Sequence, residues 1–200
     1  MVTGFVLAGG RSTRMGRDKA FLRVGRRTLV EHVAQRLRPS VTRLTVIGSA
    51  ANAERLRAIA APGEPVLEDV RPERGPLMGV YTGLMAAADP VAVFVPCDMP
   101  WVEPELVARL VAACAAGAAA AASVVPDDGW HPFPLAVRTV AARAAGALLD
   151  ADRGAMRGFL DAVDARVLTI EESWLRRSFL NLNTPADLAA LERDALAPGR

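Results

Sequence analysis

The sequence predicts an α/β fold, a three-layer structure in which a mostly parallel, twisted sheet carries helices on both faces. Short apolar runs typical of buried strands alternate along the chain with segments in which apolar residues recur at helical spacing. The most apolar run, residues 91–95, suits a central strand that is buried on both faces. The 200 residues can bury a core without disulfides, so we expect a single domain over residues 1–200.

Strands and helices are expected to alternate through the first half of the chain. The predicted strands are 4–8, 44–47, 65–67 and 91–95, and the predicted helices are 29–37, 53–60 and 80–88. The first helix rests on Leu29, Val33 and Leu37, which recur at three-to-four spacing, and Pro39 ends it. This order of elements is typical of βα units around a parallel sheet.

The second half continues the pattern less regularly. We expect a helix from Pro104 into an alanine-rich run, a strand at 119–125, a loop and then a strand within 127–137, helices at 139–149 and 155–163, and a strand at 167–170. Near the end, Thr184 before Pro185 is a helix N-cap with proline at the first helical position. Asp187 then completes a turn like a capping box.

Composition excludes several classes of function. The formal net charge is +2 and the charges are spread along the chain, so neither a nucleic-acid footprint nor a membrane-surface patch is visible. The alanine-rich run at 106–125 contains Arg109 and Gly117 and does not fit a membrane span. No secretory signal is visible, and Cys97 and Cys114 match no metal or redox spacing. We therefore expect a cytoplasmic protein with reduced cysteines.

The stretch with the most chemistry follows the first strand and reads Val6-Leu7-Ala8-Gly9-Gly10-Arg11-Ser12-Thr13-Arg14-Met15-Gly16-Arg17-Asp18-Lys19. Gly9 and Gly10 permit a tight turn, and exposed N–H groups there would form a concavity that suits an anion. Arg11, Arg14 and Lys19 would add charge for a triphosphate. The alternative is an ordinary strand-to-helix turn with solvated arginines. The spacing matches neither the G-x-G-x-x-G motif nor a P-loop.

Lys19 is singled out by composition. The chain contains 24 lysines and arginines together, and Lys19 is the only lysine among them. An ammonium acts as a compact point charge that can follow a moving phosphate, whereas a guanidinium favours a fixed bidentate geometry. We therefore predict that Lys19 acts at a phosphoryl-transfer centre, with a chance residual lysine as the alternative.

Two carboxylates stand where predicted strands end. Asp98 follows the central run, and magnesium in phosphoryl transfer is typically bound by one or two carboxylates, water and the phosphates, so Asp98 is the predicted Mg²⁺ ligand. Asp69 follows the strand at 65–67, and ligands of open α/β sheets bind outside the carboxyl ends of the strands. A polar turn before Pro72 is the alternative for Asp69. Cys97 is not a candidate nucleophile, because no base stands near it in sequence.

The segment Gly75-Pro76-Leu77-Met78-Gly79 precedes the helix expected at 80–88. Its two glycines leave no side chain between backbone and ligand, which suits a flat base that backbone groups read. The alternative is a helix-entry turn with proline in its first turn.

A second substrate pocket is suggested by later residues. His131 lies among acidic and aromatic residues before a strand, either as a general base or, with better support, as a hydrogen-bonded loop histidine. Asn181 and Asn183 fall on alternate positions of an extended segment, so their amides should face the same side.

These motifs resemble those of the molybdenum cofactor guanylyltransferases, a family of nucleotidyltransferases. The opening stretch is similar to the family's L-A-G-G-x-S-x-R-M-G-x-D-K signature, 75–79 to its G-P-L-x-G segment, where guanine sits, and 181–188 to its N-x-N-T-P-x-D-L ending. Cys97-Asp98-Met99-Pro100 matches C-D-x-P. The resemblance implies a Rossmann-like nucleotidyltransferase fold. It also implies a magnesium-dependent transfer of GMP from GTP to the terminal phosphate of molybdenum-molybdopterin, with release of pyrophosphate.

Residue roles follow from the same resemblance. Leu7, Ala8, Gly9, Gly10, Arg11 and the segment Gly75, Pro76, Leu77 and Gly79 would bind the nucleotide. Lys19 and Arg14 would neutralise its phosphates, Asp69 would contact the nucleoside, and Asp98 would hold Mg²⁺. Asn181 and Asn183, with His131, would face the pterin acceptor. Transient contact with other cofactor-biosynthesis or acceptor proteins is also implied.

One departure from the family concerns base recognition. The family often has an asparagine after the second strand, but here Ile47 is followed by Gly48-Ser49-Ala50, and Asn52 comes later. A cytidylyltransferase acting on the same pterin, or a nucleotidyltransferase with a sugar-phosphate acceptor, therefore stays open. A non-catalytic nucleotide sensor is disfavoured, because both Lys19 and Asp98 are present.

Overall fold

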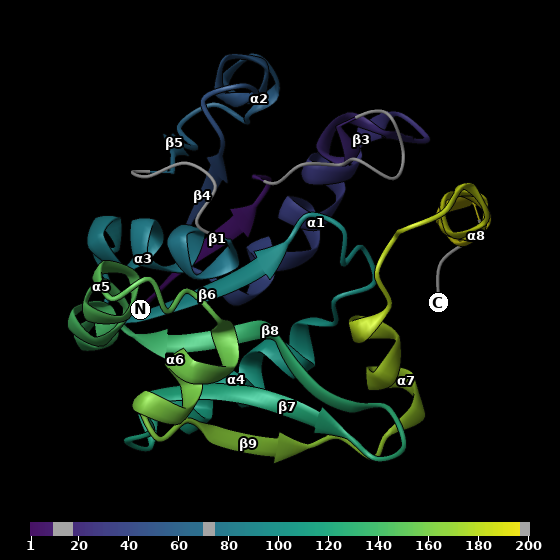
Figure 1. The fold of residues 1–200 in the computed structure, drawn as a ribbon. Coiled ribbons are helices and arrows are strands. Elements are labelled where there is room, and N and C mark those ends of the chain that lie inside the picture. The colour runs from purple at the N-terminus through teal and green to yellow at the C-terminus, as the bar shows by residue number, and fades with distance from the viewer. Residues whose placement is uncertain (10–17, 70–74, 197–200) are drawn as a thin grey trace.

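Seven strands form one sheet in the order β5-β4-β1-β6-β8-β7-β9 (Figure 1). In this computed structural model, residues 1–9, 18–69 and 75–196 are described. The strands of the sheet are β1 (Val2–Leu7), β4 (Arg43–Gly48), β5 (Val66–Glu68), β6 (Val91–Pro96), β7 (Ala120–Val125), β8 (Gly129–Arg138) and β9 (Arg166–Thr169). A separate hairpin pairs β2 (Arg23–Val24) with β3 (Arg27–Thr28).

The sheet is mostly parallel, as predicted. β1 is central and pairs in parallel with β4 on one side and β6 on the other, and β5 extends the parallel part beyond β4. β8 runs antiparallel to both β6 and β7, while β9 is parallel to β7. The strands β5, β4, β1, β6, β7 and β9 therefore all end at the same edge of the sheet.

Helices cover both faces of the sheet (Figure 1). They are α1 (Leu29–Leu37), α2 (Ala53–Ile59), α3 (Pro76–Ala86), α4 (Pro104–Ala115), α5 (Ala142–Asp150), α6 (Met156–Ala162), α7 (Ser173–Arg176) and α8 (Pro185–Leu196), with 3₁₀ turns η1 (Lys19–Phe21), η2 (Arg38–Ser40), η3 (Thr139–Ala141) and η4 (Arg177–Phe179). α1 and α4 pack on one face, and α3, α5 and α6 pack together on the other. The predicted α/β layering is confirmed.

Several element boundaries differ from the sequence predictions. The helix expected at 80–88 begins at Pro76 and ends at Ala86, because proline suits the first helical turn and Gly75 supplies the turn before it. The loop expected at the start of 127–137 is short, since β8 already begins at Gly129 and pairs with β7. The hairpin β2–β3 and the short helix α7 were not predicted, because segments of two to four residues carry too little periodicity.

The capping turn predicted at Thr184 is confirmed. The backbone N–H groups of Asn183 and Thr184 donate to Asp187 Oδ2 at 2.9 and 2.7 Å, and the Asp187 N–H donates to Thr184 Oγ1 at 3.2 Å. These bonds satisfy N–H groups that a helix start otherwise leaves unpaired.

The core is densest where α3 crosses the centre of the sheet. The rings of Phe5 on β1 and Phe94 on β6 stack with their centroids 5.0 Å apart, and both side chains are fully buried. Gly83 of α3 lies directly against this pair, because a Cβ at this position would be only 2.4 Å from Phe94 Cε1. The missing side chain allows the helix to approach the strands closely.

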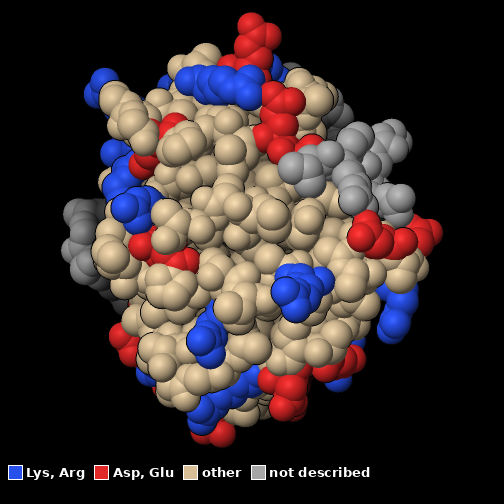
Figure 2. All heavy atoms as spheres, turned by 90° about the vertical axis from the view of Figure 1, so that its left-hand side faces the viewer, with Lys and Arg blue, Asp and Glu red and all other residues tan. Residues whose placement is uncertain are grey.

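The face of the molecule drawn in Figure 2 shows no block of one charge among the described residues. Figure 2 shows the face at the left of Figure 1, where Lys and Arg side chains are interspersed with Asp and Glu and neither sign dominates. This agrees with the formal net charge of +2. None of the helices in the described part of the chain is long and apolar enough to cross a membrane.

The close contact between Gly83 and Phe94 predicts that a side chain at position 83 destabilises the core. We expect Gly83→Ala to lower the free energy of unfolding by about 1–3 kcal/mol, because the stacked ring cannot move away from a new methyl group. Gly158→Ala is the matched control, since a Cβ at Gly158 in α6 meets nothing within 4 Å. There alanine should be neutral or stabilising by up to about 1 kcal/mol. Urea unfolding measures the free energy of unfolding of both variants. If Gly83→Ala were as stable as the parent, the close approach of α3 to Phe94 would be contradicted.

Candidate active site

Several of the predicted site residues gather at the edge where β1, β4, β5 and β6 end. The chain continues to pair beyond these strands: Ala8 N donates to Ile47 O at 2.7 Å and Asp69 N donates to Gly48 O at 3.0 Å. Cys97 N likewise donates to Leu7 O at 2.9 Å. These bonds position the backbone of Gly9, Asp69 and Asp98 next to one another, as expected for the carboxyl edge of a parallel sheet.

One half of the site is formed by Leu7, Gly9, Asp69 and Gly79. A Cβ at Gly9 would lie 3.1 Å from Asp69 Oδ2, and a Cβ at Gly79 would lie 3.1 Å from Leu7 Cδ2 and 3.6 Å from Asp69 Oδ1. Two glycines thus face one carboxylate from two different segments. This arrangement brings together residues that were predicted to bind the nucleotide from three separate parts of the sequence.

Asp69 is an unusual carboxylate. Burial raises the pKa of Asp69 to about 6, and a hydrogen bond with the Thr82 side chain partly offsets this effect. Within the described residues, its buried Oδ1 atom also lacks a hydrogen-bond donor. A buried acceptor without a donor is costly, so this oxygen is suited to accept a hydrogen bond from a ligand.

The other half of the site is built around Lys19. Its ammonium donates to Asn183 Oδ1 at 2.8 Å and lies 3.3 Å from Asp98 Oδ2. These groups come from η1, from the turn after β6 and from the segment before α8. The structure therefore places the only lysine of the chain between the predicted metal ligand and one of the two predicted acceptor-binding asparagines.

The segment that carries Asn183 is held by packing and by one backbone bond. Leu182 N donates to Asp98 O at 2.7 Å. The Leu182 side chain is fully buried in a small hydrophobic cluster whose other core members are Val24, Leu29, Trp101 and Leu191. The hairpin β2–β3 and helix α8 contribute to this cluster, so these elements anchor Asn183 beside Lys19. No sequence pattern predicts this cluster, because its members are scattered along the chain.

The remaining nucleotide-binding predictions have mixed outcomes. Gly75 has φ +74° and precedes Pro76, the first residue of α3, so here glycine serves the turn. The Leu77 side chain is fully buried in the core, and only its backbone can face a ligand. Ala8 is also buried. Gly10, Arg11 and Arg14 lie outside the described residues.

The two other predicted acceptor-binding residues are Asn181 and His131. Asn181 is exposed, two residues before Asn183, with the buried Leu182 between them, as the predicted alternation requires. His131 belongs to β8 rather than to a loop and pairs in register with Ser123. Its ring lies against Phe179 with centroids 4.4 Å apart, and its Nε2 is 3.2 Å from Asp128 Oδ2. It therefore braces the hairpin against the segment that leads to Asn181.

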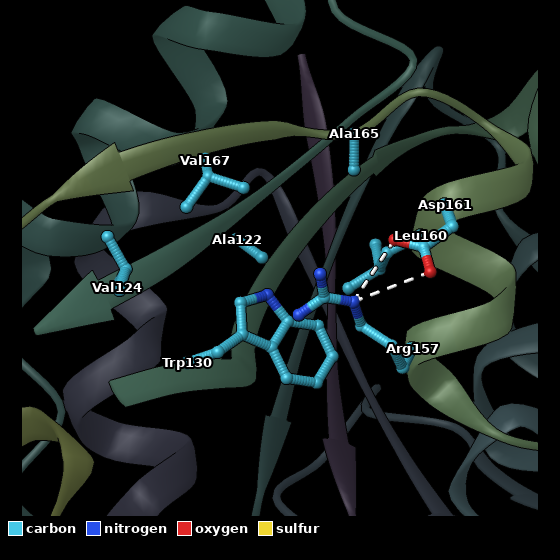
Figure 3. A pocket seen from close by; sticks show the side chains of 8 residues that line it. All are labelled: Ala122, Val124, Trp130, Arg157, Leu160, Asp161, Ala165 and Val167. Carbon is cyan, nitrogen blue, oxygen red and sulfur yellow. Dashed lines mark hydrogen bonds and ion pairs between the residues drawn. The ribbon is translucent and has the colours of Figure 1, made fainter. Parts of the chain in front are cut away.

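A separate cavity of about 250 Å³ lies between α6 and the strands β7, β8 and β9 (Figure 3). Trp130 forms one wall, and the Arg157 guanidinium extends from α6 over its ring at 5.2 Å from the centroid. Arg157 Nε is also 3.1 Å from Asp161 Oδ1. The charge of Arg157 is thus already matched by a carboxylate on its own helix.

Cys97 is not activated. Burial, together with the charges of Asp98 and Asp18, raises the pKa of the Cys97 thiol above its ordinary value. A thiol that resists ionisation is a poor nucleophile. This agrees with the sequence interpretation, which assigned the residue no catalytic role.

Asp98 could bind a metal ion together with substrate, as the sequence predicts. Its side chain is 30% exposed and lies beside the Lys19 ammonium. Across residues 1–9, 18–69 and 75–196, no group of three or more His, Cys, Asp or Glu side chains could hold a metal ion by itself. A partly exposed carboxylate fits Mg²⁺, which binds through one or two carboxylates, water and substrate phosphates.

Comparison with known proteins agrees with this geometry. The family model described as a MobA-like NTP transferase domain matches residues 4–167. The chain belongs to this family. It is 36% identical over 201 residues to a molybdenum cofactor guanylyltransferase of Burkholderia ambifaria (strain MC40-6), covering 96% of both chains. A protein of the same name from Yersinia pestis (strain Pestoides F) is 36% identical over 190 residues, covering 93% of this chain and 92% of its own.

The fold is shared with a solved structure. Molybdopterin-guanine dinucleotide biosynthesis protein A from Archaeoglobus fulgidus superposes with a TM-score of 0.82 at 22% sequence identity, covering 98% of each chain. The fold and family predicted from the sequence motifs are confirmed, and with them the nucleotidyltransferase class of enzyme.

The raised pKa of Asp69 leads to a pH-dependent stability. Asp69 has a pKa of about 6 in the folded protein, against 3.8 for an ordinary aspartate, so its ionisation destabilises the folded state. We expect Asp69→Asn to be more stable than the parent at about pH 7.5, because the amide does not ionise. The difference should shrink as the pH falls through about 6 and be gone near pH 4.

Urea unfolding at a series of pH values measures this difference. Asp161→Asn is the control, because Asp161 is an exposed carboxylate of α6. A stability difference for Asp69→Asn that does not depend on pH would contradict the raised pKa.

Proposed function

We propose that this protein transfers GMP from GTP to the terminal phosphate of molybdenum-molybdopterin and releases pyrophosphate. The observation that carries the proposal is the meeting of Lys19 with Asp98 and Asn183, at 3.3 and 2.8 Å, at the carboxyl edge of the sheet. Relatives at 36% identity over nearly the whole chain are named molybdenum cofactor guanylyltransferases, which supports the choice of substrates.

The chemistry requires positioning and charge neutralisation rather than a covalent intermediate. A terminal phosphate oxygen of the acceptor attacks the α-phosphorus of the nucleotide in line, and pyrophosphate leaves. Lys19 neutralises phosphate oxygens as charge shifts toward the leaving group, and Asn183 holds the ammonium in place. Asp98 would hold a Mg²⁺ ion, which when bound neutralises charge on the phosphate oxygens.

Recognition of guanine is supported by the carboxylate half of the site. Guanine presents two adjacent donors, the N1–H and the 2-amino group, whereas cytosine and adenine present an acceptor beside their amino group. Asp69 has a buried oxygen to which no described residue donates, and the backbone of Gly79 lies close beside it, because a Cβ there would be 3.6 Å from Asp69 Oδ1. A carboxylate with such an unused acceptor pairs better with guanine than with cytosine. The residue that would read the base is therefore Asp69, and the absence of an asparagine after β4 need not cost specificity.

A nucleotide panel tests this function. With purified molybdopterin acceptor and Mg²⁺, we expect kcat/KM for GTP to exceed that for CTP and ATP at least tenfold. Removing Mg²⁺ with a chelator should abolish turnover. Gly79→Val should reduce the preference more than it reduces stability, because its side chain would project toward Leu7 and Asp69. Equal use of GTP and CTP by the parent would favour the cytidylyltransferase alternative. Transfer to a sugar phosphate would favour a nucleotidyltransferase with a sugar-phosphate acceptor.

Lys19→Arg tests whether a compact ammonium is required. The longer, planar guanidinium cannot take the same place between Asn183 and Asp98 without displacing one of them. We expect kcat to fall at least about tenfold, about 1.4 kcal/mol in the barrier. Arg166→Lys, an exchange at an exposed arginine of β9, is the control and should leave kcat unchanged. Full activity of Lys19→Arg would show that only bulk charge matters at this position.

A further inference from the structure

Asn52 lies behind the candidate active site and connects three segments. Its side chain is almost completely buried, with 4% of the residue exposed. Its Nδ2 group donates to Ala8 O and to Asp18 Oδ2, both at 2.9 Å, and its Oδ1 accepts from Ser49 N at 2.9 Å. Both amide hydrogens are therefore in use, and neither is available for a ligand.

The absence of a side chain at Gly48 makes room for this amide. A Cβ at Gly48 would lie 2.5 Å from Asn52 Oδ1 and 2.4 Å from Leu56 Cδ1, distances that no real Cβ tolerates. Glycine at the end of β4 thus lets the Asn52 amide lie against the strand and reach Ala8. Gly48 follows Ile47 where the family often has an asparagine, and Asn52 comes four residues later. The glycine at 48 and the asparagine at 52 therefore belong to one local arrangement.

Asp18 connects Asn52 to the 3₁₀ turn that begins at Lys19. One of its oxygens, Oδ1, accepts from Ala20 N at 3.1 Å and so caps η1, while the other accepts from Asn52. A carboxylate that is bound through both oxygens has a defined orientation. Lys19 is the first residue of η1, so the position of Asp18 determines where the Lys19 backbone begins.

We propose that Asn52 is a positioning residue for Lys19. Through Asp18 it holds the start of η1 at a set distance from the end of β1, so that the ammonium lies beside Asp98 and Asn183 before substrate binds. Because a preorganised charge needs no rearrangement during the reaction, this restraint lowers the barrier rather than the affinity. The reaction concerned is the proposed nucleotidyl transfer, and the inference rests on it. Asn52 does not read the base.

Asn52→Asp is the first test. The substitution keeps the size and the acceptor for Ser49 N but removes both donors and places a second carboxylate beside Asp18. We expect kcat to fall at least tenfold while the preference for GTP over CTP stays the same. A parent-like kcat would overturn the inference, and a relaxed base preference would show that Asn52 reads the nucleoside instead. Gln35→Glu, an amide-to-acid exchange at an exposed residue of α1, is the matched control and should change neither.

Exchanging the two groups tests the contact itself. In the double variant Asn52→Asp/Asp18→Asn the amide stands at position 18 and the carboxylate at position 52, so a hydrogen bond can re-form with no change in net charge. We expect kcat of the double variant to exceed that of Asn52→Asp at least threefold. Recovery should be partial, because position 52 can no longer donate to Ala8 O. If the loss of kcat in the double variant equalled the product of the losses in the two single variants, Asn52 and Asp18 would act independently.

A spectroscopic test separates this inference from the proposed function. Lys19 is the only lysine, so protein labelled with ¹³C-lysine gives a single side-chain ε-CH₂ signal. We expect that signal to shift in Asn52→Asp, to return toward the parent position in the double variant, and to stay in place in Gln35→Glu. An unchanged signal in Asn52→Asp would overturn the inference even if the parent is fully active. A parent that transfers no nucleotide but shows these shifts would overturn only the proposed function.

Discussion

The parallel pairing of β1 with β4 and β6 is the constraint on which the rest of the structure depends. Parallel strands end at one edge, and the backbone bonds that follow them carry Gly9, Asp69 and Asp98 to that edge from three parts of the chain. The stacked Phe5 and Phe94 rings hold β1 and β6 in register. The site therefore inherits its geometry from the most buried part of the sheet, where movement is most costly.

Close approach at glycines is the second recurring feature. Gly83 brings α3 onto the sheet, Gly48 makes room for the Asn52 amide, and Gly79 lets α3 approach Leu7 and Asp69. In each case a methyl group would meet an atom of the core or of the site. The same structural device thus serves stability at Gly83 and the chemistry of the site at Gly48 and Gly79.

Charge is distributed unequally between the two halves of the site. The Lys19 half pairs an ammonium with a carboxylate and an amide, which suits phosphates and a hydrated cation. The Asp69 half is buried enough to raise the pKa of its carboxyl, which suits a base that offers donors. A nucleotide has these two ends, an anionic one and a flat one rich in donors, and the site is polarised in the same way.

The fold class, the strands of the sheet and the family could all be predicted from the amino-acid sequence, because apolar periodicity and short motifs depend on neighbouring residues. The sequence also predicted Lys19, Asp69, Asp98 and Asn183 as site residues, and that assignment stays a prediction. Only the tertiary structure decided that Lys19 contacts Asn183, that a scattered cluster around Leu182 holds that contact, and that Asn52 connects Ala8 with Asp18. The hydrogen bonds among these contacts join residues 34 to 164 positions apart. Such pairs leave no local pattern, because it is the packing of the sheet and helices that brings them together.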